Sequence, residues 1–270
     1  MPRAVPNILS IAGSDPSGGA GIQADLKTIS ALGGYAMAAL TGLTVQNTRG
    51  VRDLHMLPPA FVAAQVEAVF DDVPVDAVKL GMLGAPEVVQ AVAGVLAARR
   101  PPVVVLDPVM VAKGGARLLA PEAEAAMRAL LPLADVLTPN LPEAAVLLGA
   151  PEITTEDEML ATARALLALG PRAVLLKGGH LPGDRPSPDL LAWDGGALPL
   201  PGERIVTRNA HGAGCTLSSA LATQLALTGG DLPEAARRAK AYVAAAMRAA
   251  DRLDAGGGHG PLDHFFALRG

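Results

Sequence analysis

The stretch that decides the fold is Asn209-Ala210-His211-Gly212-Ala213-Gly214-Cys215-Thr216, which precedes a helix-forming segment at residues 217–227. Small residues ahead of a helix let the backbone approach a ligand closely, and the N–H groups of the first turn point toward whatever lies in front of them. The stretch therefore predicts a helix start that binds an anion. A glycine-rich turn into a core helix is the other interpretation, and the stretch alone leaves both open.

Cys215 is the only cysteine in the chain and lies on the first turn of this predicted helix. The positive end of a helix dipole favours a thiolate over a thiol, so we expect a lowered pKa for Cys215. The alternative is an inert buried cysteine. A single cysteine cannot form an internal disulfide, which suits the reducing cytoplasm.

The rest of the chain alternates between apolar strands and helices. Strands are predicted at residues 7–12, 36–45, 51–56, 75–80, 103–106, 136–138 and 173–176, and a hairpin at 190–200. Helices are predicted at residues 23–32, 58–70, 86–98, 121–131, 142–148, 156–169 and 231–251. This rhythm predicts an α/β fold, with a mostly parallel sheet covered by helices on both faces and an antiparallel edge. Because no long linker interrupts the pattern, we expect one domain over residues 1–270.

Four residues each follow a predicted strand: Gly13, Asp107, Asn140 and Lys177. In open parallel sheets, ligands bind at the carboxyl ends of the strands, so these residues predict one crevice. Lys177 and Lys113 each precede a Gly-Gly pair, as lysines in phosphate-facing loops would.

Composition and spacing argue against several other functions. The spacing of Gly13 and Gly18 would open a Walker A loop, but Gly19-Ala20 stands where Lys-Ser/Thr is required, and the glycines are also wrongly spaced for a dinucleotide fingerprint. The net charge is −4 and the basic residues are scattered, which argues against nucleic acid or a membrane surface as partners. No apolar stretch reaches spanning length, and the N-terminal apolar run is too short for a signal peptide.

A second stretch gives the first one its context. Ile11-Ala-Gly13-Ser-Asp-Pro-Ser-Gly18-Gly19-Ala-Gly21-Ile-Gln-Ala-Asp25-Leu-Lys27, together with residues 209–216, resembles the ribokinase-like small-molecule kinases over nearly the whole chain. Within them it is most similar to the hydroxymethylpyrimidine and phosphomethylpyrimidine kinases of thiamin biosynthesis, where cysteine replaces the usual catalytic aspartate.

The resemblance implies a ribokinase-like three-layer α/β/α sandwich. It implies ATP- and Mg²⁺-dependent phosphorylation of 4-amino-5-hydroxymethyl-2-methylpyrimidine and then of its monophosphate, in a cytoplasmic homodimer. Pyridoxal kinase is the nearest alternative, because it shares the fold, the motifs and an aromatic hydroxymethyl substrate. A non-catalytic ligand sensor on the same fold is a further alternative.

The resemblance also implies roles for individual residues. Cys215 would act as base or orient the hydroxyl, with the N–H groups of Gly212, Ala213 and Gly214 holding the transferred group. The implied positions are Gly13, Asp25, Gln46, Met82 and Val109 for the substrate, Asn140, Lys177, His211 and Lys240 for ATP, and Asp107 and Glu143 for Mg²⁺. Ala210 and Ala213 stand where these kinases commonly have threonine, which puts hydroxyl contacts there in doubt but not the backbone cradle.

Ordinary structural roles compete with several of these assignments. The Gln46 amide offers a donor and an acceptor side by side, which matches the ring-nitrogen and amino edge of an aminopyrimidine, but most glutamines are solvated. Asn140, in Asn140-Leu-Pro-Glu143, is also a typical helix cap. Mg²⁺ keeps several waters and takes few carboxylates, so Asp107 and Glu143 would suffice beside the ATP phosphates.

Overall fold

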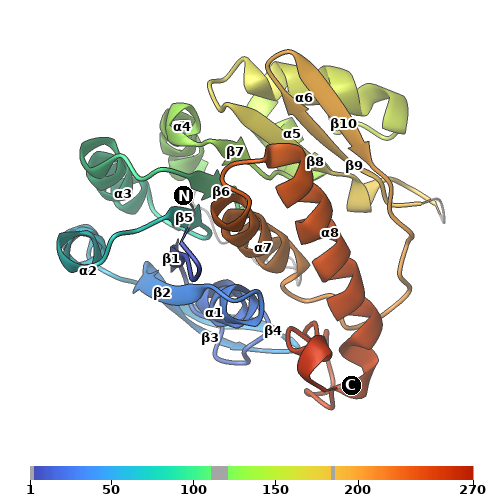
Figure 1. Ribbon diagram of the computed structural model, residues 1–270, viewed down its shortest axis with the longest axis horizontal. Coiled ribbons are helices and arrows are strands. Elements are labelled where there is room, and N and C mark those ends of the chain that lie inside the picture. The colour runs from blue at the N-terminus through green and yellow to red at the C-terminus, as the bar shows by residue number, and fades with distance from the viewer. Residues whose placement is uncertain (1–2, 111–120, 184–185, 270) are drawn as a thin grey trace.

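The computed structural model describes residues 3–110, 121–183 and 186–269 (Figure 1). Its centre is an eight-stranded sheet in the order β10-β9-β8-β7-β6-β5-β1-β2. The strands are β1 (Asn7–Ala12), β2 (Tyr35–Leu40), β5 (Ala77–Leu80), β6 (Val104–Leu106), β7 (Val136–Leu137), β8 (Ala173–Lys177), β9 (Asp189–Trp193) and β10 (Gly196–Leu200). Pairing is parallel from β2 to β8, whereas β9 and β10 are antiparallel. The predicted mostly parallel sheet with an antiparallel edge is confirmed.

Helices cover both faces of this sheet. They are α1 (Gly21–Ala31), α2 (Pro59–Asp72), α3 (Pro86–Arg99), α4 (Pro121–Leu130), α5 (Leu141–Leu148), α6 (Met159–Leu167), α7 (Ala213–Leu227) and α8 (Leu232–Ala249). Short 3-10 turns lie at Leu131–Leu133, Glu156–Glu158, Gly178–His180, Ala250–Arg252 and Phe266–Leu268. The buried side chains of α2 to α6 pack in one apolar cluster, and those of α1, α7 and α8 in another. The expected three-layer α/β/α sandwich is therefore confirmed (Figure 1).

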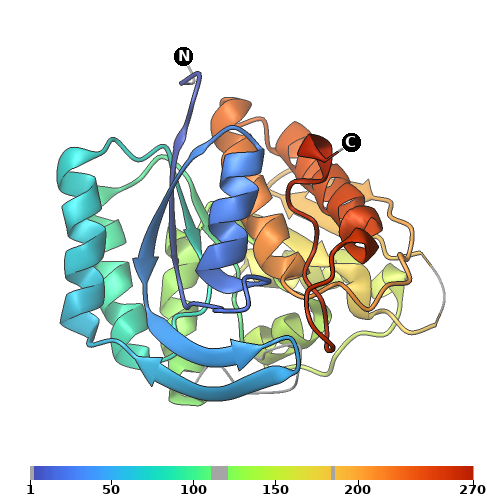
Figure 2. The ribbon, with the colours of Figure 1, turned by 90° about the horizontal axis from the view of Figure 1, so that it is seen from below.

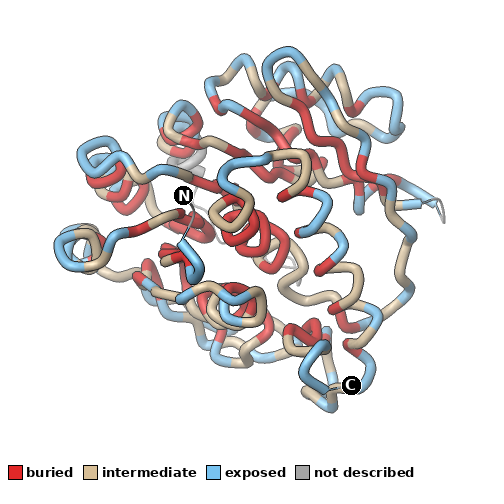
Figure 3. Tube along the Cα trace, viewed as in Figure 1, coloured by how far each residue is buried: buried red, intermediate tan, exposed pale blue. Residues whose placement is uncertain are grey.

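The central helix of the second layer is α7. It lies against β5 and β6 of the sheet and is flanked by α1 and α8. Every residue from Thr216 to Leu225 is buried, and Figure 3 shows this helix as an almost continuous buried segment. Because this segment is buried all round, its polar side chains included, its packing holds the N-terminus of α7 at the edge of the sheet.

Residues 36–45 do not form the single strand that the sequence predicted. β2 ends at Leu40, and β3 (Gly42–Asn47) pairs instead with β4 (Gly50–Met56) in a separate antiparallel hairpin (Figure 2). Thr41 fixes the break, because its N–H donates to the Ala12 carbonyl at 3.0 Å and its hydroxyl to the Met82 carbonyl at 2.6 Å. The predicted strand ran through Thr41 and Gly42, and the contacts that fix this corner are distant in sequence.

In the part of the chain that the structure describes, no helix is both long enough and apolar enough to span a membrane.

Candidate active site

Two adjoining cavities lie along the carboxyl ends of the parallel strands. Their volumes are about 460 Å³ and about 1170 Å³. Gly13, Asp107, Asn140 and Lys177 all line the smaller cavity, which confirms the crevice expected from their positions after strands. Asn140 and Lys177 also line the larger cavity, so the two spaces meet at these side chains.

The start of α7 forms another part of the wall that both cavities share. Ala213 and Gly214 line both spaces, and Cys215 lines the smaller one. Gly212 caps the helix with φ of +81°, and a Cβ there would collide with the carbonyl oxygen of Gly19. First-turn N–H groups have no partner within their helix, so this wall presents hydrogen-bond donors and the positive end of the dipole. The arrangement suits an anion such as a transferring phosphoryl group.

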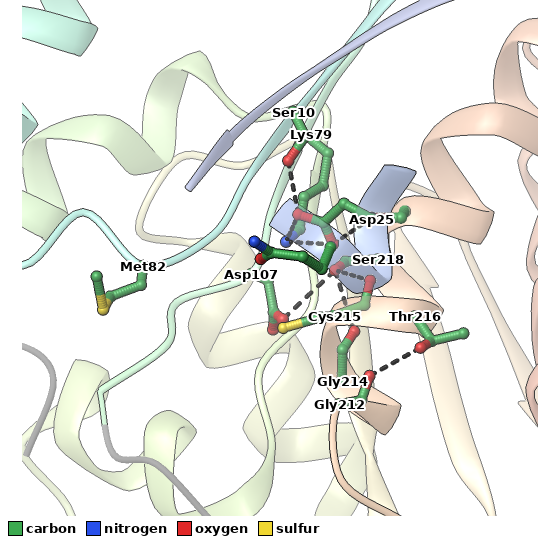
Figure 4. A network of polar contacts seen from close by, with 12 residues as sticks. Ser10, Asp25, Lys79, Met82, Asp107, Gly212, Gly214, Cys215, Thr216 and Ser218 are labelled. Carbon is green, nitrogen blue, oxygen red and sulfur yellow. Dashed lines mark hydrogen bonds and ion pairs between the residues drawn. The ribbon is translucent and has the colours of Figure 1, made fainter. Parts of the chain in front are cut away.

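Cys215 does not have the lowered pKa that its helix position suggested. Desolvation by the surrounding protein raises the pKa of its thiol to about 11; the charge of Lys79 opposes the shift, while Asp25 and Asp107 add to it. The prediction of a stabilised thiolate is therefore wrong, because desolvation and the carboxylates outweigh the helix terminus and Lys79. Figure 4 shows Cys215 at the start of α7 among these polar side chains. Near neutral pH it is a thiol that can orient a hydroxyl, and only its deprotonated fraction can accept a proton.

Lys177 holds two carboxylates where the cavities meet. Its Nζ donates to Oδ1 of Asp107 at 2.9 Å and lies 3.8 Å from Oε2 of Glu143. Burial alone would lower the pKa of Lys177, but the two carboxylates raise it above its usual value. Burial raises the pKa of Glu143 to about 7; Lys177 opposes this shift and the charge of Asp107 adds to it. The cluster therefore has more negative than positive charge when both carboxylates are ionised.

Asp107 and Glu143, the predicted Mg²⁺ ligands, line the same cavity. Among the described residues, no group of three or more His, Cys, Asp and Glu side chains is placed to hold a metal ion. Mg²⁺ nevertheless commonly binds through one or two carboxylates together with waters and substrate phosphates. Two carboxylates that share one ammonium group fit that requirement, and their role as ligands remains a prediction.

Asn140 has the structural role that was the plainer interpretation. Its Oδ1 accepts the N–H of Glu143 at 2.8 Å, and Oε2 of Glu143 accepts the N–H of Asn140 at 2.8 Å, which forms a capping box at the start of α5. This box fixes Glu143 at the cavity wall. Contact of Asn140 with ATP remains a prediction.

Gln46, Met82 and Val109 line the smaller cavity together with Gly13. A Cβ on Gly13 would collide with the terminal methyl of Met82, so glycine lets the loop after β1 pass close to this apolar side chain. Thr44, on the same face of β3 as Gln46, also lines the cavity and was not identified from the sequence. These residues give the cavity an apolar wall with one amide group, while their contact with a substrate stays a prediction.

His211 lies between the hairpin and the loop after β1. It lines the smaller cavity, and its Nε2 lies 2.8 Å from Oδ2 of Asp15 and 3.2 Å from the Gln46 side chain. The hairpin and the loop after β1 hold this ring on the Gln46 side, and its contact with ATP remains a prediction. Burial works to raise the pKa of Asp15, but hydrogen bonds from His211 and Ser17 hold it below its usual value.

Asp25 was predicted to contact the substrate, but it does not line the cavity. It is fully buried, and its carboxylate accepts hydrogen bonds from Lys79, Ser10 and Ser219 at 2.6 to 2.9 Å (Figure 4). Because both oxygens are occupied by these partners, Asp25 acts behind the site rather than in it. Sequence reasoning missed Lys79; the available signal was a lysine inside the apolar strand Ala77–Leu80.

Lys240, on α8, lines the larger cavity. Its Nζ lies 2.7 Å from Oδ2 of Asp189 and donates to the Ser187 carbonyl at 3.1 Å. The position is compatible with the predicted contact to ATP but also explains the lysine as an anchor for residues 187–189. Lys113 lies outside the described residues.

Comparison with known proteins identifies one family across most of the chain. A family model described as phosphomethylpyrimidine kinase matches residues 15–263. The hydroxymethylpyrimidine/phosphomethylpyrimidine kinase of Escherichia coli (strain K12) is 51% identical over 262 residues, which cover 97% of this chain and 98% of that protein.

Solved structures show the same fold. A phosphomethylpyrimidine kinase from Clostridium difficile 630 aligns with a TM-score of 0.78 and 43% identity, over 88% of this chain and 97% of that one. The pyridoxal kinase of Staphylococcus aureus in complex with AMP-PCP and pyridoxal aligns with a TM-score of 0.88 and 35% identity, over 99% and 96%. Sequence identity is thus higher to the pyrimidine kinases, whereas the fold is shared with both.

Proposed function

Because this chain belongs to the phosphomethylpyrimidine kinase family, we propose that it phosphorylates 4-amino-5-hydroxymethyl-2-methylpyrimidine with ATP, and then phosphorylates the monophosphate to the pyrophosphate used for thiamin. One observation carries the assignment of the site: the Gln46 amide, the apolar residues Met82 and Val109, and the α7 start with Cys215 line one cavity. An aminopyrimidine needs an amide partner and an apolar wall, and its hydroxymethyl group needs a phosphoryl donor close by.

The chain's own groups would act mainly by positioning and charge stabilisation, as phosphoryl transfer requires. The first-turn N–H groups at Ala213, Gly214 and Cys215 bind the transferring group, and the Lys177 ammonium offsets its negative charge. The Cys215 thiol orients the substrate hydroxyl. Since the pKa of Cys215 is about 11, only its deprotonated fraction can take up the hydroxyl proton once the oxygen–phosphorus bond is forming.

Mg²⁺ is part of the proposal. Asp107 and Glu143 would hold it through oxygen atoms and water, beside Lys177. The ion would supply positive charge to the ATP phosphates. The residues contribute the placement of that charge, because Asp107 directly follows β6 and the capping box of α5 fixes Glu143.

Domain organisation, assembly and location complete the proposal. One kinase domain over residues 1–270 is supported by a family match that spans nearly all the strands and helices. A homodimer is supported by exposed apolar side chains at the β2 edge and on the hairpin, Tyr35, Leu43 and Val45. The cytoplasm supplies ATP and keeps the Cys215 thiol reduced.

Pyridoxal is the second candidate substrate, because the S. aureus pyridoxal kinase shares the fold over almost the whole chain. The test is ATP turnover with the aminopyrimidine, its monophosphate and pyridoxal, each alone and in pairwise competition. We expect the two pyrimidines to be preferred. A wild-type preference for pyridoxal would overturn the pyrimidine assignment.

Gln46→Ala sharpens this test. Loss of two buried hydrogen bonds, partly replaced by water, should cost about 2–3 kcal/mol in kcat/KM with the aminopyrimidine. Pyridoxal has no adjacent ring-nitrogen and amino edge, so any activity with it should hardly change. Equal loss of both activities would remove Gln46 from the recognition of the pyrimidine edge.

A further inference from the structure

Asp15 has no part in the proposed phosphoryl transfer. Its carboxylate is buried and accepts hydrogen bonds at both oxygens. Oδ1 accepts from the N–H and the hydroxyl of Ser17, and Oδ2 accepts from the N–H groups of Gly19 and Ala20, at 2.6 to 3.2 Å. Such a surrounding favours the ionised form of the carboxylate. Oδ2 also lies 2.8 Å from Nε2 of His211.

An ionised carboxylate at that distance requires a proton on the facing ring nitrogen. A lone pair on Nε2 of His211 would face the lone pairs of Asp15, so Nε2 must carry the hydrogen, whether the ring is neutral or charged. Asp15 thereby turns the facing edge of His211 into a hydrogen-bond donor. That edge also faces Gln46.

The Gln46 amide has to match this donor. Its Nε2 lies 3.2 Å from Nε2 of His211, which would place two donors against each other. On the other side, the Thr44 hydroxyl lies 3.2 Å from Oε1 of Gln46, although its only hydrogen is directed to the Ser14 carbonyl at 2.9 Å. A half-turn of the amide removes both conflicts, because Oε1 then shares the single Nε2 hydrogen of His211 with Asp15, and Nε2 of Gln46 donates to the Thr44 oxygen.

We propose that Asp15 and His211 are positioning residues that fix the Gln46 amide in one orientation and thereby determine which aromatic edge the site accepts. The fixed amide holds its oxygen toward His211 and its N–H₂ toward Thr44. The remaining lone pair of the oxygen and the second N–H are then available to the cavity in a fixed order.

The fixed positions of the amide oxygen and the amide N–H select one kind of ring, an inference that rests on the proposed function. A 4-aminopyrimidine can donate from its amino group to Oε1 while its ring nitrogen accepts from Nε2. The 4-oxo analogue carries a carbonyl and a ring N–H in the same places, so each would meet a like partner. The amide cannot turn to accommodate it without breaking its contacts to His211 and Thr44.

The experiment compares kcat/KM for the 4-amino substrate and its 4-oxo analogue. Two mismatched buried hydrogen bonds give an expected wild-type preference on the order of 10³-fold or more for the amino form. His211→Leu has a similar volume without a donor, so the preference should fall at least about tenfold, mainly through a higher KM for the amino substrate. His55→Leu, an exposed histidine on β4, is the matched control and should keep the wild-type preference.

The outcomes separate this inference from the proposed function. A wild type that accepts the oxo analogue equally well, or a folded His211→Leu variant that loses both activities at an unchanged ratio, would overturn the inference. A wild type inactive on both pyrimidines would overturn the proposed function instead. In that case, and if the variant does not fold, the assigned ¹⁵N spectrum of the wild-type histidine rings decides: we expect a proton on Nε2 of His211, and an unprotonated Nε2 would overturn the inference.

Discussion

Two lysines on strands of the central sheet have different surroundings. Lys79, in β5, is fully buried, and its Nζ donates to both oxygens of Asp25 at 2.9 and 2.8 Å. Lys177, at the end of β8, keeps 14% of its side chain exposed and faces the two carboxylates of Asp107 and Glu143. The first lysine has one counter-charge and the second has two.

Both lysines line the smaller cavity, but only one of the two charge clusters is balanced. Asp25, on α1, also accepts from Ser10 of β1 and Ser219 of α7, so the Lys79 pair joins four elements and leaves no charge unmatched. The Lys177 cluster has an excess of negative charge at the cavity wall when both carboxylates are ionised, and burial raises the pKa of Glu143 to about 7. An unmatched cluster can be completed by a ligand, whereas a matched pair is complete without one.

The largest expected effect is on stability. Lys79→Met leaves Asp25 as a buried carboxylate without its cation, which should cost about 3–5 kcal/mol of unfolding free energy. Urea unfolding measures it. The control is Lys79→Met combined with Asp25→Leu, which should recover most of the loss because no charge is then left alone. Wild-type stability in the single variant would show that the pair does not hold these elements together.

Lys177→Met should have the reverse profile. Loss of the ammonium that faces the transferring group should lower kcat about 10²- to 10³-fold. The stability loss should be smaller than for Lys79→Met, because Glu143 can take up a proton near neutral pH. Steady-state kinetics and urea unfolding of both variants test the contrast, which fails if Lys177→Met is the less stable of the two.

Cys215→Ser should lower kcat about 10²-fold while substrate binding survives, because a serine hydroxyl is a much weaker proton acceptor than a thiolate. The deprotonated form accepts the proton, so wild-type turnover should rise as the pH increases from 7 toward the thiol pKa of about 11. The serine variant should show no such rise. A flat wild-type profile with near-equal kcat in both proteins would limit Cys215 to orienting the hydroxyl.

Glu143→Gln should have the smallest effect on stability and a pH-dependent one. The pKa of Glu143 is raised from 4.5 to about 7 in the folded state, so folding favours the protonated side chain. Its contribution to the free energy of unfolding is therefore fully present below pH 4.5 and is lost as the pH rises through 7. Glutamine imitates the protonated side chain, so the variant should be more stable than wild type by about 1–3 kcal/mol at pH 8 and equal to it near pH 4.5. Thermal melting at both pH values checks the sign.

The same variant should need more Mg²⁺ for half-maximal rate, since an amide is a poorer partner for a hydrated hard cation. Pyrimidine affinity should hardly change. An unaltered Mg²⁺ requirement would leave Glu143 with its capping role alone.

The sequence predicted the architecture because strands such as β1 and β5 are short apolar runs between helix signals, and such runs have few alternatives. Periodicity could not place the corner at Thr41, which depends on Ala12 and Met82. In the site, glycines and carboxylates after strands indicated the crevice, since topology alone brings strand ends together.

Properties set by burial were beyond the sequence. The pKa of Cys215 follows from desolvation and not from helix position, and Asp25 turned inward because Lys79 lies opposite it in the core. His211 was placed by proximity to the glycine-rich run, whereas its ring faces Asp15, a residue 196 positions away in the chain. Contacts between side chains so far apart in the chain leave no pattern in the sequence around either residue.

The β3–β4 hairpin is tied down at its tip. The N–H of His259 donates to the Thr48 carbonyl at 2.8 Å, and the N–H of Gly258 donates to the Thr48 hydroxyl at 3.2 Å. The adjacent carbonyl of Gly260 accepts from the N–H of His211 at 3.0 Å. The C-terminal segment thus closes a loop around the hairpin that carries Gln46. The β3–β4 hairpin therefore loses its conformational entropy when the chain folds and not when a ligand binds. Ligand binding then has no entropic cost of ordering the hairpin. Removing the hydrogen bonds between the C-terminal segment and Thr48 would make ligand association slower and entropically unfavourable, although no atom of the cavity wall would be replaced.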